Sequence, residues 1–446
     1  MNEDACQSFL KIADQFKLGE LETESPHPLT VNLAADAQND LPSAIEVLKQ
    51  VDIKALHKLE PLLPQVAELG KVIDDTLTLG GKIFMCGCGA TGRLSIALET
   101  FCRQSLAEEI YKDRFIGFMA GGDVALIKSI ENFEDRPEYG SRQLKDLGFN
   151  QNDLLIGITE GGETPFVIGA TEAAANISKR KPWFLFCNPV EQLVTIVERS
   201  KNIIENPNVK ALSLPTGPMG LSGSTRMQAS TILMTSIGWA IQSKGVFTDL
   251  TQLYSRFSKF WSDLNLSGLE PFIRSESDTY TDGDQTIYRT NRFGVTVLTD
   301  TTERSPTFSL PAFENEFDTQ GHNGWCYLSI ENTKTPTQAW EKVLQRPPRC
   351  LEWNDITQDT GLNYLYGFHI DNSCEDKRRI SNHTSNQLLF DIDETDSGFS
   401  FSFRGNSWSC NTCKLTSFEL NIVLKLVLNI HSTLVMGRMK RFESNL

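Results

Sequence analysis

The sequence predicts an α/β protein with two doubly wound parallel-sheet domains, the second degenerate, preceded by a helical segment. Two observations predict this class. From Lys82 onward, short apolar runs alternate with helix-like stretches, and three of the runs lead through a glycine- and hydroxyl-rich turn into a helix. Strands that alternate with helices are typical of a parallel sheet covered by helices on both faces.

Length and composition limit the possible classes of protein. A chain of 446 residues has room for about two to three domains. Hydrophobic residues make up 40% and charged residues 22%, which excludes a disordered, collagen-like or coiled-coil protein. The net charge of −15 repels nucleic acid and anionic lipid, so we expect no nucleic acid and no membrane among the partners.

The sequence predicts a cytoplasmic protein without metal or cofactor. The N-terminus lacks the apolar run of a signal peptide. The long apolar stretch 420–436 is interrupted by polar residues, so it predicts a buried helix rather than a membrane span. Ten cysteines are too sparse for a disulfide framework. Cys410 and Cys413 form a lone CxxC pair, which lacks the four ligands of a structural zinc site.

The first 75 residues predict helices, because apolar residues recur every three to four positions over 41–51 and 55–79. Asp40 followed by Pro42 is typical of a helix start. Residues 76–245 then predict the first α/β domain. Its expected strands cover 82–86, 115–120, 153–158, 183–187 and 211–215, and its expected helices include 93–104, 164–177 and 228–241.

Residues 250–446 predict a second, degenerate α/β domain. The apolar run 294–299 predicts a strand, and residues 300–305 after it form either a second phosphate loop or a structural turn. The polar segments 275–292 and 371–412 predict loops or weakly ordered chain. The final stretch 420–439 resembles in pattern the helix that closes the first domain, which suggests an internal duplication.

Three loops carry the candidate ligand-binding residues, at 87–93, 159–165 and 216–226. In an open α/β sheet, ligands bind beyond the carboxyl ends of the strands. Glycines allow close approach of the backbone, and the helix N-termini that follow supply N–H donors for a phosphate. The candidate phosphate-binding residues are Gly89, Thr91, Gly92, Arg93, Thr159, Glu160, Gly161, Thr164, Ser222, Ser224 and Thr225.

A nicotinamide dinucleotide is an alternative ligand, because Gly87, Gly89 and Gly92 match the GxGxxG pattern. That pattern needs an acidic residue about 20 positions later to bind the ribose. The strand after the first loop ends near Asp123, 31 positions beyond Gly92. The spacing therefore favours a phosphomonoester over a dinucleotide.

At these loops the sequence resembles the sugar isomerase (SIS) domain family, in the branch of N-acetylmuramic acid 6-phosphate etherases and the glucokinase regulatory protein. The motifs that carry the resemblance occur in the same order as in that branch. They are ESPHPLTVNL (24–33), KIFMCGCGATGRL (82–94), AGGDVALIKSIENFED (120–135), GITEGGETPFVIGA (157–170) and TGPMGLSGSTRMQAS (216–230).

The resemblance implies a phosphorylated amino sugar or hexose as ligand, bound without metal or nucleotide. Etherases of this branch cleave a lactyl ether by elimination and then add water, with two glutamates as acid and base. Glu134 falls on the motif position of one glutamate. The position of the other is Phe101, and the nearest carboxylate is Glu99, which we keep as a second catalytic candidate.

The sequence leaves the activity open between a lyase or isomerase that uses Glu134 and a non-catalytic sensor that binds a sugar phosphate and a partner protein. Etherases of this branch tend to have Ser-Gly-Arg-Thr where this chain has Gly161-Gly-Glu-Thr164, a departure that leaves the fold prediction unchanged. A homo-oligomer is a further possible assembly, and a nicotinamide-dependent oxidoreductase is the second alternative.

Overall fold

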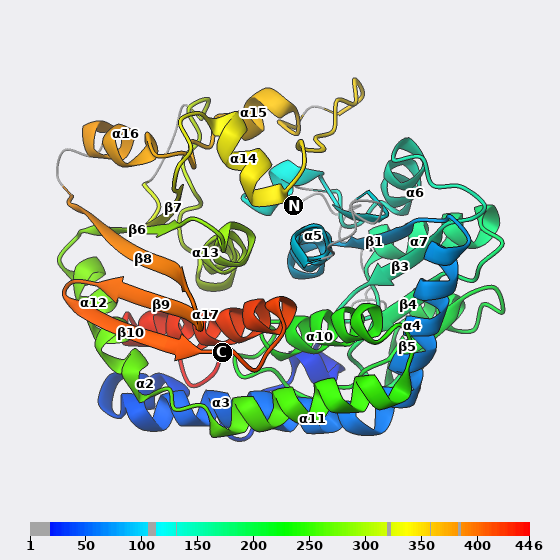
Figure 1. Cartoon of the computed structure of the whole chain (residues 1–446), viewed down its shortest axis with the longest axis horizontal. Coiled ribbons are helices and arrows are strands. Elements are labelled where there is room, and N and C mark those ends of the chain that lie inside the picture. The colour runs from blue at the N-terminus through cyan, green and yellow to red at the C-terminus, as the bar shows by residue number, and fades with distance from the viewer. Residues whose placement is uncertain (1–17, 106–112, 131, 319–322, 357, 382–384) are drawn as a thin grey trace, which may run out of the picture.

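A computed structural model of the chain describes residues 18–105, 113–130, 132–318, 323–356, 358–381 and 385–446 (Figure 1). The predicted helices before the first sheet are present as α2 (Leu33–Asn39), α3 (Leu41–Leu59) and α4 (Leu63–Thr78). The Asp40 side chain accepts a hydrogen bond from the Ser43 N–H and so caps α3. Residues 1–17 of the predicted helical segment lie outside the described residues.

The first sheet is fully parallel, with the strand order β2-β1-β3-β4-β5. Its strands are β1 (Ile83–Gly87), β2 (Phe115–Met119), β3 (Leu154–Ile158), β4 (Trp183–Phe186) and β5 (Lys210–Ser213). The connecting helices are α5 (Gly89–Ser105), α6 (Pro137–Asp146), α7 (Pro165–Ile177), α8 (Val190–Ile196), α9 (Glu198–Ile204) and α10 (Gln228–Ser243). The strands and helices predicted for this part of the chain are therefore confirmed.

The second sheet has the order β10-β9-β8-β6-β7, with β6, β7 and β8 parallel and β9 and β10 antiparallel. Its strands are β6 (Gln285–Thr290), β7 (Cys326–Ile330), β8 (Gln387–Thr395), β9 (Gly398–Phe403) and β10 (Asn406–Asn411). Its helices are α12 (Glu270–Thr281), α13 (Gly294–Phe308), α14 (Pro336–Leu344), α15 (Leu362–Tyr366), α16 (Cys374–Ser381) and α17 (Ser417–Arg438), and α11 (Phe247–Asp263) connects the halves.

The two loop predictions for the second half are wrong. Residues 275–292 and 371–412 contain strands β6 and β8–β10 rather than loops. In Gly398–Phe403 the phenylalanines alternate with serines, so one face of the strand is buried and the other is polar. The polar composition of these segments therefore reflects strands with one solvated face.

The predicted strand 294–299 is the first part of helix α13. The run is buried on nearly all sides, and a short apolar run in such surroundings does not distinguish strand from helix. Residues 300–305 continue the helix, so they form no phosphate loop. The hydroxyls of Thr301 and Thr302 donate to carbonyls one turn earlier, at Val297 and Leu298, and Pro306 stands within the last turn.

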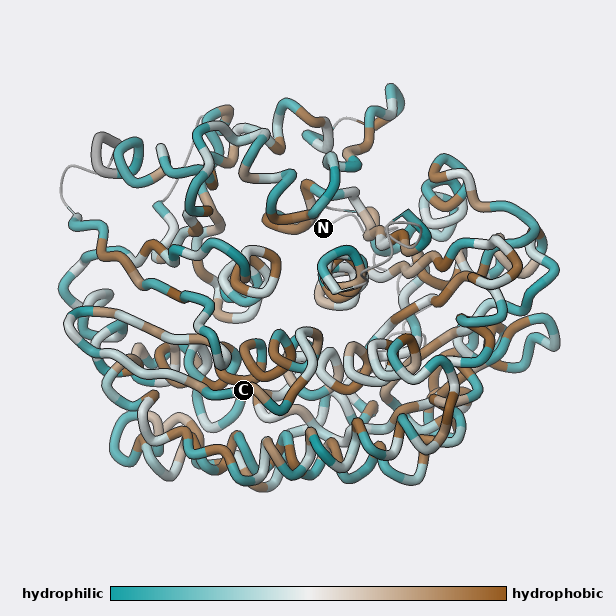
Figure 2. Tube along the Cα trace, in the orientation of Figure 1, coloured by the Kyte–Doolittle hydropathy of each residue, from teal (hydrophilic) through white to brown (hydrophobic). Residues whose placement is uncertain are grey.

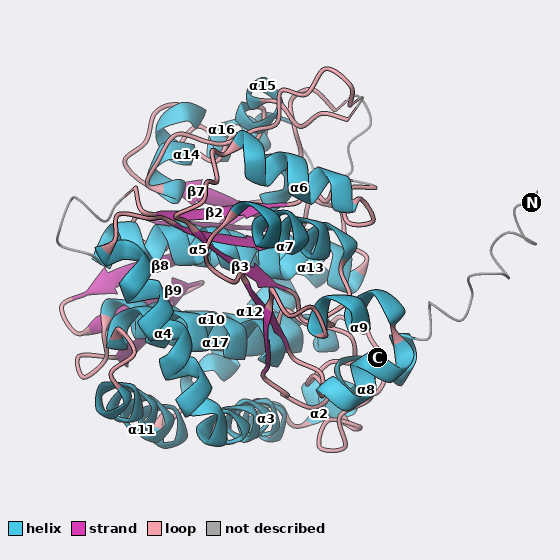
Figure 3. Ribbon diagram, turned by 90° about the vertical axis from the view of Figure 1, so that its right-hand side faces the viewer, coloured by secondary structure: helices cyan, strands magenta, loops and turns pink. Residues whose placement is uncertain are grey.

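Four helices fill the space between the two sheets. In Figure 1, α5 and α13 lie side by side at the centre, and α10 and α17 continue the layer beneath them. One hydrophobic core includes residues of both sheets and these helices. Figure 2 shows hydrophobic residues, in brown, along these elements. A second cluster covers the other face of the first sheet under α6 and α7 (Figure 3).

Helix α17 is long and apolar enough to cross a membrane, but 94% of its most apolar window is buried inside the protein. The prediction of a buried helix here is therefore confirmed.

Candidate functional site

The three predicted loops follow the carboxyl ends of β1, β3 and β5 in the first sheet and lead into α5, α7 and α10. The Ser230 hydroxyl of α10 donates to a carboxylate oxygen of Glu160 in the second loop, at 3.1 Å. The Glu134 carbonyl accepts a hydrogen bond of 2.9 Å from the Phe166 N–H in the first turn of α7. Segments far apart in the sequence are thus joined around one edge of the sheet.

The first loop is a tight turn that only glycines permit. Gly89 has φ +51°, in the left-handed region. A Cβ on Gly92 would lie 2.5 Å from the Met119 Cβ, too close for any other residue. The Thr91 hydroxyl accepts from the Cys88 N–H at 3.1 Å and donates to the Cys88 carbonyl at 2.9 Å. The loop therefore folds back on itself and presents the N-terminus of α5.

The second loop is held by its own hydroxyls. Thr159 and Thr164 share a hydrogen bond of 3.0 Å between their Oγ1 atoms, and Thr159 also accepts from the Gly162 N–H at 3.2 Å. The Gly161 carbonyl accepts from the Asn188 amide at 3.0 Å. These bonds fix the backbone N–H groups that precede α7.

The third loop carries two hydroxyls without partners. Among the described residues, the buried Oγ atoms of Ser222 and Ser224 make no hydrogen bond. Buried hydroxyls are normally paired, because an unpaired one costs about 1–3 kcal/mol. Two unused donors beside the N-terminus of α10 are therefore available to a bound polar group. Thr225, the third predicted residue of this loop, lies next to them and is half-buried.

Both described ends of the chain pack against these loops. Thr23 exchanges two hydrogen bonds with Asn188, of 3.2 and 3.1 Å. The Asn445 carbonyl accepts from the Ser222 N–H at 2.8 Å, while the Asn445 amide donates to the His27 carbonyl at 3.0 Å. In the sequence, only the motif at 24–33 indicated that the N-terminal segment belongs to the site.

Carboxylates gather beside the loops with raised pKa values. Burial raises the pKa of Glu160 to about 8, and the negative charges of Glu303 and Glu134 add to the shift. Partial desolvation raises the pKa of Glu134, together with the charges of Glu163 and Asp135. The Glu134 carboxyl is also a hydrogen-bond neighbour of the Cys88 thiol. The Glu160 carboxyl can therefore exchange protons near neutral pH, and the pKa of Glu134 is shifted in the same direction.

Arg93 lies within the protein rather than at the surface of the loop. Its side chain is buried, its Nε donates to the Leu126 carbonyl at 3.0 Å, and its Nη1 lies 4.0 Å from the Glu303 Oε1. These contacts brace α5 against the second half of the chain. The role of Arg93 as a phosphate ligand stays a prediction.

Glu99 is a buried ion-pair centre. Its carboxylate pairs with Arg103 at 3.0 Å, with Arg346 at 3.1 Å and with Arg349 at 2.8 Å, and it accepts from the Gly117 N–H at 3.0 Å. Burial alone would raise its pKa, but the arginine charges outweigh burial and lower it. The three arginine contacts and the lowered pKa favour a structural role for Glu99 over proton transfer.

Phe101 occupies the position where the family motif implies a second glutamate. Its ring is 3% exposed and packs edge-on against the Phe418 ring, with centroids 5.9 Å apart. This position therefore belongs to the hydrophobic core between α5 and α17.

Glu303 on α13 lies against Arg93 of the first half and was not among the residues predicted from the sequence. The available signal was the spacing of Asp300, Glu303 and Arg304, since charged residues three and four positions apart share one face of a helix. Within the described parts of the chain, no group of three or more His, Cys, Asp and Glu side chains is placed to hold a metal ion.

Comparison with known proteins identifies the family. Residues 65–175 match the model of the glucokinase regulatory protein N-terminal SIS domain. The N-acetylmuramic acid 6-phosphate etherase of Aliivibrio fischeri (strain MJ11) is 32% identical over 238 residues, which cover 52% of this chain and 73% of the relative. The chain belongs to the N-acetylmuramic acid 6-phosphate etherase family.

Another etherase of this family, from Rippkaea orientalis, is 33% identical over 236 residues, which cover 53% of this chain and 71% of the relative. Among solved structures, the C-terminal domain of glucosamine-fructose-6-phosphate aminotransferase from Francisella tularensis aligns with a TM-score of 0.44 at 10% identity. It covers 90% of this chain and 96% of that chain. The two etherase relatives confirm the resemblance of the sequence motifs to this family.

Proposed function

We propose that this member of the etherase family binds a phosphorylated amino sugar or hexose at the three loops and cleaves an ether of that sugar with Glu134 as acid and base. The observation that carries the proposal is the pair of unpartnered hydroxyls in the third loop, Ser222 and Ser224. The oxygens of a phosphate would accept the hydrogen bonds that these two hydroxyls do not make within the protein. The names of the relatives support an amino-sugar phosphate.

The phosphate and the sugar require different surroundings. The phosphate binds best at the N-termini of α5, α7 and α10, where free N–H groups and the helix dipole favour an anion. The sugar then extends toward Glu134 and Glu160, whose carboxyls suit hydroxyl and proton-transfer partners. The pKa of Glu134 is raised toward neutral pH. This direction suits a residue that must act first as a base and then as an acid. We place the protein in the cytoplasm on the sequence grounds given above.

A non-catalytic sensor is the second candidate. The buried packing of Phe101 against Phe418 favours it, because no carboxylate stands at the second glutamate position of the motif. A sensor would bind the sugar phosphate at the same loops and change its affinity for a partner protein. It would release no product.

Proton NMR of the purified protein with N-acetylmuramic acid 6-phosphate separates the two candidates. The lyase releases free lactate, and Glu134→Gln should lower the rate about 100-fold or more while the ligand still binds. The matched control is Glu138→Gln, which removes an exposed carboxylate four residues away and should leave the rate unchanged. Binding without lactate favours the sensor, and absence of binding refutes the proposed ligand.

The hydroxyl contacts are tested by calorimetry. Ser222→Ala combined with Ser224→Ala should weaken binding of the same sugar phosphate at least tenfold, because hydrogen bonds to a charged group contribute about 1.5–3 kcal/mol each. An affinity within twofold of the wild type would place the phosphate elsewhere.

A further inference from the structure

Glu303 is a buried carboxylate without a hydrogen-bond partner. The residue is 5% exposed, and its Oε1 accepts no hydrogen bond from any described residue. Its nearest charged contact is the Arg93 Nη1 at 4.0 Å. Burial raises the pKa of Glu303, against the opposing charges of Arg93, Arg226 and Lys425.

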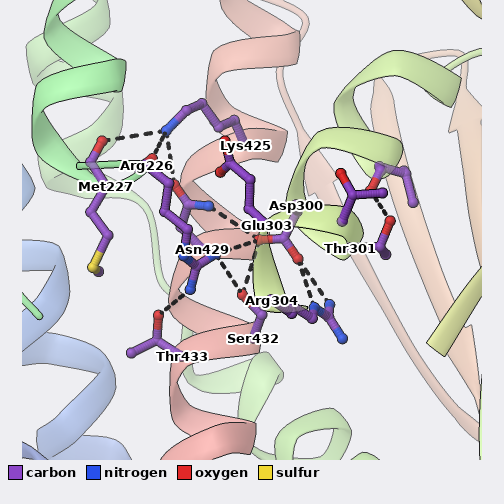
Figure 4. A network of polar contacts seen from close by, with 12 residues as sticks. Arg226, Met227, Asp300, Thr301, Glu303, Arg304, Lys425, Asn429, Ser432 and Thr433 are labelled. Carbon is purple, nitrogen blue, oxygen red and sulfur yellow. Dashed lines mark hydrogen bonds and ion pairs between the residues drawn. The ribbon is translucent and has the colours of Figure 1, made fainter. Parts of the chain in front are cut away.

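The cations around Glu303 are engaged elsewhere (Figure 4). Arg226 binds Asp300 at 3.1 Å and the Thr433 hydroxyl at 2.9 Å. Lys425 donates to the Arg226 carbonyl at 2.8 Å and to further oxygens of Thr231 and Asn429, both at 2.8 Å. Buried carboxylates are costly unless they are paired and hydrogen-bonded, so one whose Oε1 has only a 4.0 Å ion-pair contact calls for a role beyond stability.

Glu303 of the second half lies near charged residues of the first half, among them Arg93 of α5 at 4.0 Å. The charged and titratable groups around it come from every element packed there. They are Arg93 at the start of α5, Glu160 in the second loop, Arg226 after the third loop, Asp300 on α13 and Lys425 on α17. Glu303 is thus a carboxylate of the second half whose charge acts on Glu160 in the second loop.

We infer that Glu303 is the second proton-transfer carboxylate of the sugar site. Helix α13 supplies it, whereas the motif position of the second glutamate is occupied by Phe101. The inference rests on the proposed lyase function. It assigns to the second half of the chain a residue that touches the substrate, and it gives the site two carboxylates from opposite halves.

The proton balance is complete with these two groups. The Glu134 carboxylate takes the proton from the carbon next to the sugar aldehyde. The bond between the neighbouring carbon and the ether oxygen breaks, its electron pair leaves with the lactate oxygen, and that oxygen takes the proton of the Glu303 carboxyl. Water then adds across the new double bond. Its oxygen bonds to the carbon that carried the ether, one of its protons passes to the Glu303 carboxylate, and Glu134 returns its proton to the carbon next to the aldehyde, so both carboxyls regain their starting protonation states.

The test is the pH profile of lactate release from N-acetylmuramic acid 6-phosphate, with binding measured by calorimetry. Glu303→Gln should lower kcat about 100-fold, change the dissociation constant less than threefold, and remove the alkaline limb that deprotonation of the acid imposes. Glu303→Asp should retain that limb with a smaller loss of rate. Glu316→Gln, an exposed carboxylate that bonds His369 in the second half, is the control and should change nothing.

The outcomes separate this inference from the proposed function. Suppose that the wild type releases lactate and Glu134→Gln does not. If Glu303→Gln then keeps the wild-type rate of lactate release and the alkaline limb, the inference alone is wrong. If the wild type binds the sugar phosphate and releases no lactate at any pH, the lyase proposal and the inference both fail. If Glu303→Gln does not fold, Glu303→Asp decides, since loss of the alkaline limb in that variant would overturn the inference.

Discussion

The ion-pair network around Asp300 gives the sharpest prediction about stability. Asp300 is 2% exposed and accepts from Arg226 at 3.1 Å and from Arg304 at 2.9 and 3.1 Å (Figure 4). Asp300→Asn keeps the shape but removes the charge between two buried guanidinium groups. Breaking such a pair costs about 3–5 kcal/mol. Because Arg304 retains Glu276 at 2.9 Å, we expect a loss near the lower end, about 3 kcal/mol.

The pH dependence of this loss is a second part of the same test. Burial alone would raise the pKa of Asp300, but the charges of Arg304 and Arg226 outweigh burial and lower it. A lowered pKa contributes stability that is present above the unfolded value of about 3.9 and is lost as the pH falls through the folded value. The difference between wild type and Asp300→Asn should therefore be constant from pH 6 to 8 and shrink below about pH 4.

Urea unfolding followed by tryptophan fluorescence measures the free energy of unfolding at each pH. The control is the double variant Asp300→Asn with Arg226→Met, which removes one of the stranded cations as well. Its loss should be smaller than the sum of the two single losses. A loss under about 1 kcal/mol for Asp300→Asn at pH 7, or a difference that grows on acidification, would refute the reasoning.

Three further predictions concern single side chains. Phe101→Ala removes a ring packed on Phe418 and should lower the free energy of unfolding by about 3–5 kcal/mol, measured in urea. Glu160 has a pKa raised to about 8, so its contribution to stability is lost as the pH rises from about 4.3 through 8. Glu160→Gln should therefore be more stable than wild type at pH 9 and nearly equal at pH 4, as thermal melts at the two pH values will show. Glu99→Gln should destabilise the fold by about 3 kcal/mol, because it leaves Arg349 without its counter-charge, yet keep the affinity for the sugar phosphate within threefold.

The first sheet and its loops could be predicted because their signals are local. Each strand of this sheet is a run of four or five residues, and three of the strands lead through a glycine-rich turn into a helix. The turn at 87–93 requires glycine in the left-handed region and at close approach, so sequence and geometry indicate the same loop. Such features depend little on distant residues.

The second half was harder to predict because packing decides its structure. The run 294–299 is rich in valine and threonine, which favours a strand in isolation, but it lies between α5 and the second sheet as a helix. The place of Glu303 depends on the same packing, and so do the bonds between Arg226 and Asp300, which lie 74 positions apart. No local pattern contains that information.

The two halves of the chain depend on each other at the ligand loops. Arg226 closes the third loop, and its charge is held by Asp300 of α13 and its carbonyl by Lys425 of α17. Asn445 near the end of the chain fixes the Ser222 N–H. In α13, by contrast, the Thr301 hydroxyl donates to the Val297 carbonyl within the same helix. The second half therefore lacks a phosphate loop at 300–305. It supports the third loop through Asp300 and Lys425, and we propose that it also supplies the carboxylate of Glu303.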